Sequence, residues 1–130
     1  MILLDTHEFI WWIHDDKALP NASRRAIIAN EATGLAISVI TCWEIAKKVE
    51  IGKLELTMDV SDWIHQALAY PGVSVLNLTP AIAIESARLP QPFHRDPADQ
   101  IIVATSRVLD IPLLTEDARI KAYPYVRLAL

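Results

Sequence analysis

The sequence predicts an α/β fold of three layers, in which helices cover both faces of a central parallel sheet of about four to five strands. Short apolar runs alternate with longer amphipathic segments along the chain, the pattern of βαβ units. The first run, residues 2–4, is continuously apolar, as in a strand buried on both faces, and ends abruptly at Asp5. We expect one domain over residues 1–130, because a chain of this length can form one hydrophobic core.

Each predicted strand is a short apolar run set off from its neighbours by turn or breaker residues. Gly34 precedes the second run, and Pro71 with Gly72 precedes the third, so the chain turns at both places. The predicted strands are residues 2–4, 35–39, 73–78 and 111–114, with residues 126–128 as a candidate fifth strand.

The segments between these strands carry apolar residues at helical spacing and begin at helix-capping residues. The predicted helices run from the acidic turn after residue 4 to residue 14, from Asn21 or Ser23 to about residue 32, from Thr41 to Gly52, from Asp59 or Ser61 to about residue 70, from Pro80 to residue 89 and from Pro97 to residue 109.

The last of these helices has the clearest beginning. Asp96 is placed to cap it, and Pro97 suits the first helical position because its missing N–H is not needed there. Asp99 follows in the first turn, at the edge of the expected core. The predicted buried face of this helix consists of Ile101, Ile102, Thr105, Val108 and Leu109.

Composition narrows the class of protein. The apolar fraction of 52% and the four Trp residues argue against disorder. A formal net charge of -4 gives no overall attraction to nucleic acid, so contact with RNA or DNA must come from local basic residues. The candidates, either as a solvated face or as a phosphate-contacting rim, are Lys47, Lys48, Lys53 and Arg95.

We expect a soluble, cytoplasmic protein without a membrane partner. The single cysteine, Cys42, excludes an internal disulfide and fits a reducing compartment. The longest stretch free of charged Asp, Glu, Lys and Arg, residues 63–84, is interrupted by Pro71, Gly72 and Pro80, so it does not resemble a membrane span. All three glycines lie in predicted turns, which excludes a glycine-rich phosphate loop.

Four acids follow the ends of predicted strands. Asp5 comes directly after the first strand, Glu44 lies just inside the helix after the second, Asp99 lies in the first turn of the late helix, and Asp117 follows the fourth strand. Carboxyl ends of parallel strands meet at one edge of a sheet, where ligands usually bind. Clustered carboxylates repel one another unless a cation compensates, and hard oxygen ligands favour Mg²⁺ or Mn²⁺ over zinc.

Local rules also explain each acid by itself. Asp5 and Thr41 each stand three residues before a glutamate, the spacing of a capping box. Asp96 fits a helix cap, and the helix dipole would favour Asp99 and Asp117. Separate capping roles do not explain why acids follow so many strand ends, so a shared site remains the sharper hypothesis.

Other polar residues are weaker candidates. His7, near Asp5, could touch a metal or substrate but has no partner at ligand spacing. Thr6 and Ser38 could hold a water or a phosphate oxygen, although both residue types are common caps. The residues expected at the surface or satisfied within the core are His14, His65 and His94.

The chain resembles the PIN-domain ribonucleases and, within them, the toxins of VapBC-type toxin-antitoxin modules. The resemblance covers nearly the whole chain, and the order and spacing of its short motifs are specific. They are LLDTH at 3–7 with the Trp pair at 11–12, SV at 38–39 with WEIAK at 43–47 and GKL at 52–54, DPAD at 96–99 with IVAT at 102–105, and LLTED at 113–117.

This resemblance implies a PIN-like fold and hydrolysis of RNA with Mg²⁺ or Mn²⁺. The family's metal-binding acids match the four strand-end acids. Asp5 and Asp99 are expected as the most direct ligands of one or two ions, with Glu44 and Asp117 as ligands through water or of a second ion. The expected polar supports are Thr6, Ser38 and Thr115. The resemblance also implies a homodimer and a cognate antitoxin that blocks the site, held by exposed Trp and aliphatic side chains.

Three alternatives differ in function. A housekeeping PIN-domain nuclease would process RNA without an antitoxin, and a non-catalytic PIN-type module would bind without cutting. A phosphate-accepting receiver domain is also small and doubly wound, but it should show an acidic pair after the first strand and a lysine after the last. The sequence has neither feature in place.

Overall fold

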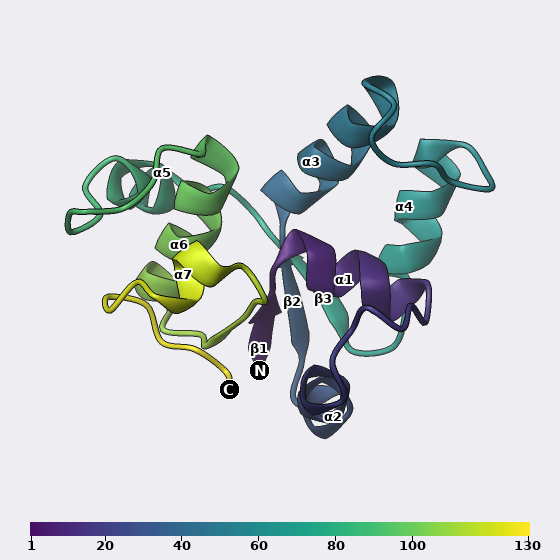
Figure 1. The fold of residues 1–130 in the computed structure, drawn as a ribbon, viewed down its shortest axis with the longest axis horizontal. Coiled ribbons are helices and arrows are strands. Elements are labelled where there is room, and N and C mark those ends of the chain that lie inside the picture. The colour runs from purple at the N-terminus through teal and green to yellow at the C-terminus, as the bar shows by residue number, and fades with distance from the viewer.

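The computed structural model describes residues 1–130 and confirms the predicted α/β/α architecture (Figure 1). Four parallel strands form the central sheet in the order β3-β2-β1-β4. β1 lies between β2 and β4, so that Leu3 pairs with both Ala36 and Leu113. The strands are β1 (Ile2–Leu4), β2 (Leu35–Ser38), β3 (Val73–Leu76) and β4 (Leu113–Leu114).

Seven helices cover the two faces of the sheet. Alternate residues of β1 serve the two cores: Leu4 packs on one face with Phe9, whereas Leu3 packs on the other with Ile102. None of the helices is both long and apolar enough to cross a membrane. They are α1 (Thr6–Ile13), α2 (Asn21–Asn30), α3 (Val39–Glu50) and α4 (Val60–Leu68) on the first face, and α5 (Pro80–Ser86), α6 (Pro97–Leu109) and α7 (Ala118–Lys121) on the second.

The predicted strand bounds need four corrections. β4 covers only residues 113–114 of the predicted run 111–114. β2 stops at Ser38, because the Ser38 hydroxyl accepts the N–H of Ile40 and caps α3. α3 consequently begins before Thr41, the predicted start. β3 ends at Leu76, where its partner β2 also ends. Residues 126–128 form no fifth strand; a single parallel bridge joins Leu128 to the two-residue strand β4.

Three helices also differ from expectation. α2 has no side-chain cap, because Pro20 occupies its N-cap position. The predicted caps Asn21 and Ser23 both lie inside the helix, and the buried Ser23 donates to Glu116. α5 ends at Ser86 rather than residue 89, so that Leu89 can leave the helix and enter the second core. α7 was not predicted, because four residues are too few to show a helical period.

The buried face of α6 is rotated from the predicted one. Val108 and Leu109 are 38% and 43% exposed. The residues that do pack inward include Ala98, Ile102 and Thr105. The sequence of this helix contains two rows of small and apolar residues at helical spacing, and either row could be read as the buried face. This rotation is important for the site, because it also turns Asp99 inward.

Candidate active site

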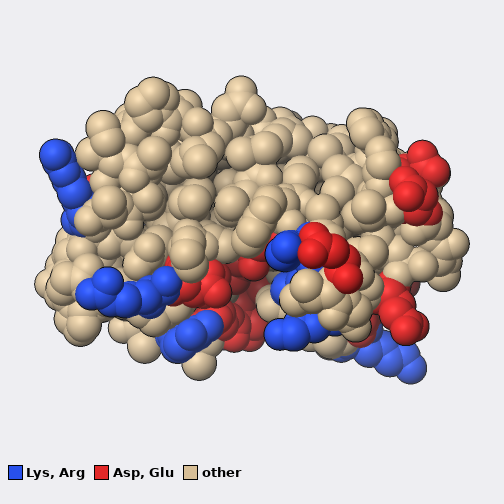
Figure 2. Space-filling model, turned by 90° about the horizontal axis from the view of Figure 1, so that it is seen from above, with Lys and Arg blue, Asp and Glu red and all other residues tan.

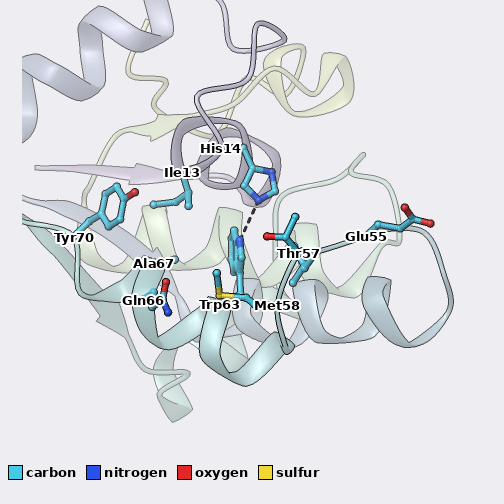
Figure 3. A pocket seen from close by; sticks show the side chains of 10 residues that line it. Ile13, His14, Glu55, Thr57, Met58, Trp63, Gln66, Ala67 and Tyr70 are labelled. Carbon is cyan, nitrogen blue, oxygen red and sulfur yellow. Dashed lines mark hydrogen bonds between the residues drawn. The ribbon is translucent and has the colours of Figure 1, made fainter.

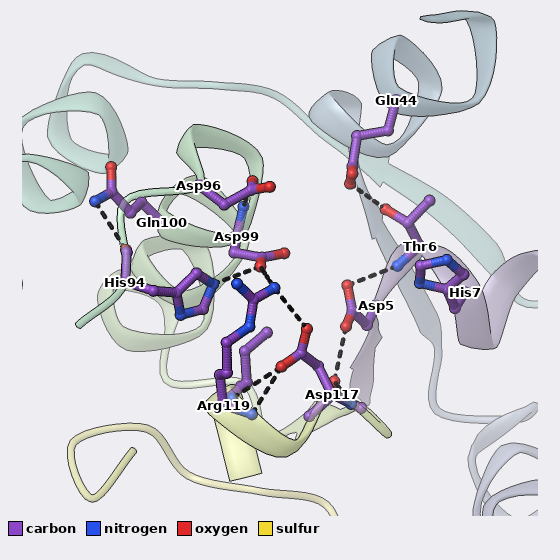
Figure 4. Close-up of polar contacts among 12 residues, drawn as sticks. Asp5, Thr6, His7, Glu44, His94, Asp96, Asp99, Gln100, Asp117 and Arg119 are labelled. Atoms are coloured by element: carbon purple, nitrogen blue, oxygen red, sulfur yellow. Dashed lines mark hydrogen bonds and ion pairs between the residues drawn. The ribbon is translucent and has the colours of Figure 1, made fainter. Parts of the chain in front are cut away.

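The four strand-end acids lie around one space at the carboxyl ends of β1 and β4 (Figure 4). Asp5 follows β1 directly, Glu44 lies on α3, Asp99 lies in the first turn of α6, and Asp117 precedes α7. Figure 2 shows acidic side chains within a hollow of the surface, with Lys and Arg side chains on both sides of it. The parallel sheet thus brings the predicted acids to the same edge.

Asp5 is the most deeply placed of the four, with 5% of its surface exposed. Its Oδ1 accepts the N–H of Thr6 at 2.8 Å, and its Oδ2 accepts the hydroxyl of Thr115 at 2.7 Å. Burial raises the pKa of Asp5 above its usual value, although both hydrogen bonds oppose the shift. The predicted Asp5–Glu8 capping box does not form, because the Glu8 carboxyl accepts the N–H of Glu116 instead.

Glu44 is held by a chain of hydroxyl groups. Thr6 donates to Oε1 of Glu44 at 2.6 Å, so its oxygen must accept the proton of Thr41, 2.9 Å away. Thr41 is therefore used in this chain and does not form the predicted capping box. Burial raises the pKa of Glu44, with smaller contributions in the same direction from Asp5 and Asp99.

Asp99 is buried at the start of α6, where its own N–H donates to Oδ1 of Asp96 at 3.0 Å. Asp96 is thereby confirmed as the helix cap. Nε2 of His94 lies 2.6 Å from Oδ2 of Asp99, and because a carboxylate only accepts, this nitrogen carries the proton when Asp99 is ionised. Burial raises the pKa of Asp99, the His94 hydrogen bond lowers it, and the charges of Asp96 and Asp5 raise it further.

Asp117 differs from the other three acids because its pKa is lowered. Partial burial alone would raise that pKa, but it is outweighed by hydrogen bonds from the side chain and N–H of Arg119 and from the N–H of Ile120. One guanidinium nitrogen of Arg119 lies 3.3 Å from Oδ2 of Asp117 and 3.6 Å from Oδ2 of Asp99. Figure 4 shows Arg119 between these two acids.

Sequence reasoning missed two partners of the acids. His94 was expected at the surface or satisfied within the core, yet it binds Asp99; the short spacing His-x₄-Asp was the only signal. Arg119 was not considered, although the spacing Asp-x-Arg marks it. The clustered acids were expected to lack a basic partner within the protein. This expectation is wrong for Asp117, which pairs with Arg119.

The carboxylate oxygens of the four acids are possible ligands for a divalent cation. Carboxylate oxygens are the preferred donors for Mg²⁺ and Mn²⁺. The charge of Asp5 raises the pKa values of both Glu44 and Asp99, and a bound cation would relieve this repulsion. In this structure no three His, Cys, Asp or Glu side chains are grouped closely enough to hold an ion. Arg119, an exposed side chain, supplies the compensating charge. The donor atoms are thus of the kind that binds a divalent cation, but in this conformation they do not form a complete coordination sphere.

The remaining candidates have separate partners. Nε2 of His7 lies 3.1 Å from the ammonium nitrogen of Lys48, and Ser38 caps α3. His14 accepts the indole N–H of Trp63 at 3.0 Å, beside a cavity of about 440 Å³ between α1 and α4 (Figure 3). These three residues have no hydrogen bond to the four acids.

The chain is similar to known proteins along nearly its whole length. A family model described as PIN domain matches residues 2–124. Ribonuclease VapC22 of Mycobacterium tuberculosis is 32% identical over 126 residues, which cover 97% of this chain and 94% of the relative.

Solved structures share the fold at lower identity. VapBC2 from Rickettsia felis, bound to a DNA fragment from its promoter, matches with a TM-score of 0.72 and 16% identity over 98% of this chain and 97% of that one. A toxin-antitoxin complex from Klebsiella pneumoniae matches with a TM-score of 0.67 and 21% identity over 100% and 98% of the two chains. At these identities the likeness concerns the fold.

Proposed function

The chain belongs to the PIN-domain family, and from this premise we propose that it is a divalent-metal-dependent endoribonuclease, the toxin of a toxin-antitoxin module. The observation that carries the proposal is the gathering of Asp5, Glu44 and Asp99 at one sheet edge, with raised pKa values. Similarity to Ribonuclease VapC22 along almost the whole chain supports RNA as the substrate.

In this proposal the four acids bind the cation and their neighbours keep them in place. Asp5 and Asp99 ligate directly, and Glu44 and Asp117 ligate through water or hold a second ion. A cation held by these acids would supply a water of lowered pKa and a positive charge for the leaving oxygen of the phosphodiester. Thr6 and Thr115 orient Glu44 and Asp5 by the hydrogen bonds they donate.

Removal of the metal tests the proposal directly. The purified protein should cleave single-stranded RNA in Mg²⁺ or Mn²⁺, stop in excess EDTA and recover when the metal is restored, because without a cation no Lewis acid lowers the pKa of the attacking water. Gel analysis of the fragments measures this. The Asp5→Asn protein, purified in the same way, should leave the RNA intact and so exclude a contaminating nuclease. Undiminished cleavage in EDTA would refute metal dependence.

Thr115 offers a test of the supporting hydrogen bonds. Thr115→Val should reduce cleavage by about 10- to 100-fold, the usual cost of removing an outer-shell partner, because Asp5 loses its 2.7 Å hydrogen bond. Thr115→Ser keeps the hydroxyl and should remain close to the wild type. The measurement is the initial cleavage rate at saturating Mg²⁺, with thermal unfolding to establish that both proteins fold. Equal rates for the two variants would contradict the assigned role.

We further propose an antitoxin partner and a homodimer. Of the four Trp residues only Trp43 is largely exposed, at 57%, and it stands next to Glu44 on α3. An exposed indole beside the proposed site is a suitable anchor for a protein that blocks it. Coexpression with the product of an adjoining gene should yield a stable complex without RNase activity, and gel filtration reports the number of toxin chains in it. A complex that still cleaves RNA would contradict this arrangement.

A further inference from the structure

We propose that a cleft beside the four acids is an RNA subsite, in which Lys48 and Lys53 bind a backbone phosphate and Trp11 stacks on an adjoining base. The inference rests on the proposed ribonuclease function and identifies where the strand next to the cut site would lie. The cleft has a volume of about 340 Å³ and lies between α1 and the C-terminal half of α3. His7, Trp11, Lys48, Lys53 and Leu54 are among its lining residues.

The cleft lies next to the site of the acids: none of the four acids lines it, but the charge of Lys48, one of its lining residues, lowers the pKa of Glu44. His7, two residues after Asp5 on α1, forms one of its walls. On α3, Lys48 follows Glu44 by four residues, so the two side chains share a face of the helix about 6 Å apart along its axis. A strand held with one phosphate among the acids would therefore extend past His7 towards Lys48.

The positive charges in the cleft are free to bind an anion. Neither Lys48 nor Lys53 forms an ion pair, whereas the adjacent Lys47 is paired with Glu50 at 3.0 Å. The ammonium group of Lys48 donates to Nε2 of His7 at 3.1 Å, which holds it at the inner end of the cleft. One carboxylate, Asp16, also lines the cleft, but it accepts the N–H of Ala18 in a turn.

Trp11 gives the cleft an aromatic wall. Its ring is half-buried and lies against His7, with ring centroids 5.7 Å apart at an interplanar angle of 38°. An aromatic face beside unpaired cations is the combination that binds single-stranded nucleic acid, because bases stack on the ring while the backbone meets the charges. The formal net charge of -4 makes these local cations the means of attracting RNA.

Binding of a short single-stranded RNA to the full chain in EDTA, followed by fluorescence anisotropy, tests the subsite without cleavage. Lys48→Met should raise Kd several-fold and reduce the slope of log Kd against log salt by about 0.7, the share of one phosphate contact. Trp11→Leu should raise Kd about tenfold, and Trp11→Phe should restore most of the loss. Lys47→Met, one residue away on the same helix, is the matched control and should leave Kd unchanged.

Cleavage in Mg²⁺ separates this inference from the proposed function. The Lys48→Met and Trp11→Leu proteins should show a higher KM with kcat little changed. A wild-type protein that never cleaves RNA refutes the ribonuclease, whereas active Lys48→Met protein with wild-type Kd and KM overturns the subsite alone. Loss of antitoxin binding with unchanged RNA binding would make the cleft a protein site and equally overturn it. If Trp11→Leu fails to fold, the Lys48→Met, Lys53→Met double variant and its salt slope decide.

Discussion

Asp99→Asn should reduce RNA cleavage by at least about a hundredfold while leaving the chain folded, since losing a direct ligand should cost more than losing an outer-shell partner. Asn has nearly the shape of Asp but lacks the charge that would hold a cation. Burial raises the pKa of Asp99, so its ionised form is unfavourable in the metal-free fold, and removing that charge should keep or raise the free energy of unfolding. Initial cleavage rates at saturating Mg²⁺, together with thermal unfolding in EDTA, measure both effects.

Asp96→Asn is the matched control for this prediction. Asp96 stands three residues earlier and caps the same helix through Oδ1, and Asn caps helices about as well as Asp. The Asp96→Asn protein should therefore keep its activity within a few-fold. If the Asp99→Asn protein were as active as the Asp96→Asn protein, Asp99 would not be a metal ligand, and the proposed mechanism would fail.

The sequence could predict the sheet edge because local patterns determine it. A continuous apolar run such as residues 2–4 has to be buried on both faces, which places Asp5 at its carboxyl end. The same reasoning located Asp99 after the Asp96 cap. Boundaries were less certain, since α3 begins at Val39 only because the Ser38 side chain competes for the first free N–H groups.

The resemblance implied Thr115 as a polar support, but which acid each long-range partner meets could not be predicted, because that depends on how the layers are placed. Thr115 meets Asp5 across 110 positions of sequence, and Glu8 meets Glu116 across 108. Among the basic residues, no sequence pattern separates Lys48, which turns into the cleft, from Lys47, which pairs with Glu50 on the surface. Only the orientation of α3 against α1 distinguishes them.

Glu8 should make the protein less stable as the pH rises from about 4.5 to about 8. Only 1% of its surface is exposed, Oε1 accepts the N–H of Glu116 at 2.8 Å, and Oε2 is buried without a partner. Burial, reinforced by the charges of Asp5 and Glu116, raises the pKa of Glu8 from 4.5 to about 8. The folded state therefore retains a proton that the unfolded state has released, and the free energy of unfolding falls throughout that interval.

Glu8→Gln isolates this effect, because a glutamine has the shape of the carboxyl and cannot ionise: its oxygen still accepts from Glu116, and its NH₂ group takes the place of the carboxyl O–H. The variant should match the wild type below about pH 4, where Glu8 is protonated in both the folded and the unfolded state, and exceed its free energy of unfolding by up to about 3 kcal/mol at pH 7. Urea unfolding at a series of pH values in EDTA measures the difference. Asp5, Glu44 and Asp99 also have raised pKa values and titrate in both proteins, so their separate contributions cancel in the comparison; the repulsion between Asp5 and Glu8, which only the wild type has, is part of the measured difference. Glu55→Gln changes an exposed position and should follow the wild-type dependence of the free energy of unfolding on pH. If Glu8→Gln followed the wild type in the same way, Glu8 would ionise in the folded protein as readily as in the unfolded chain.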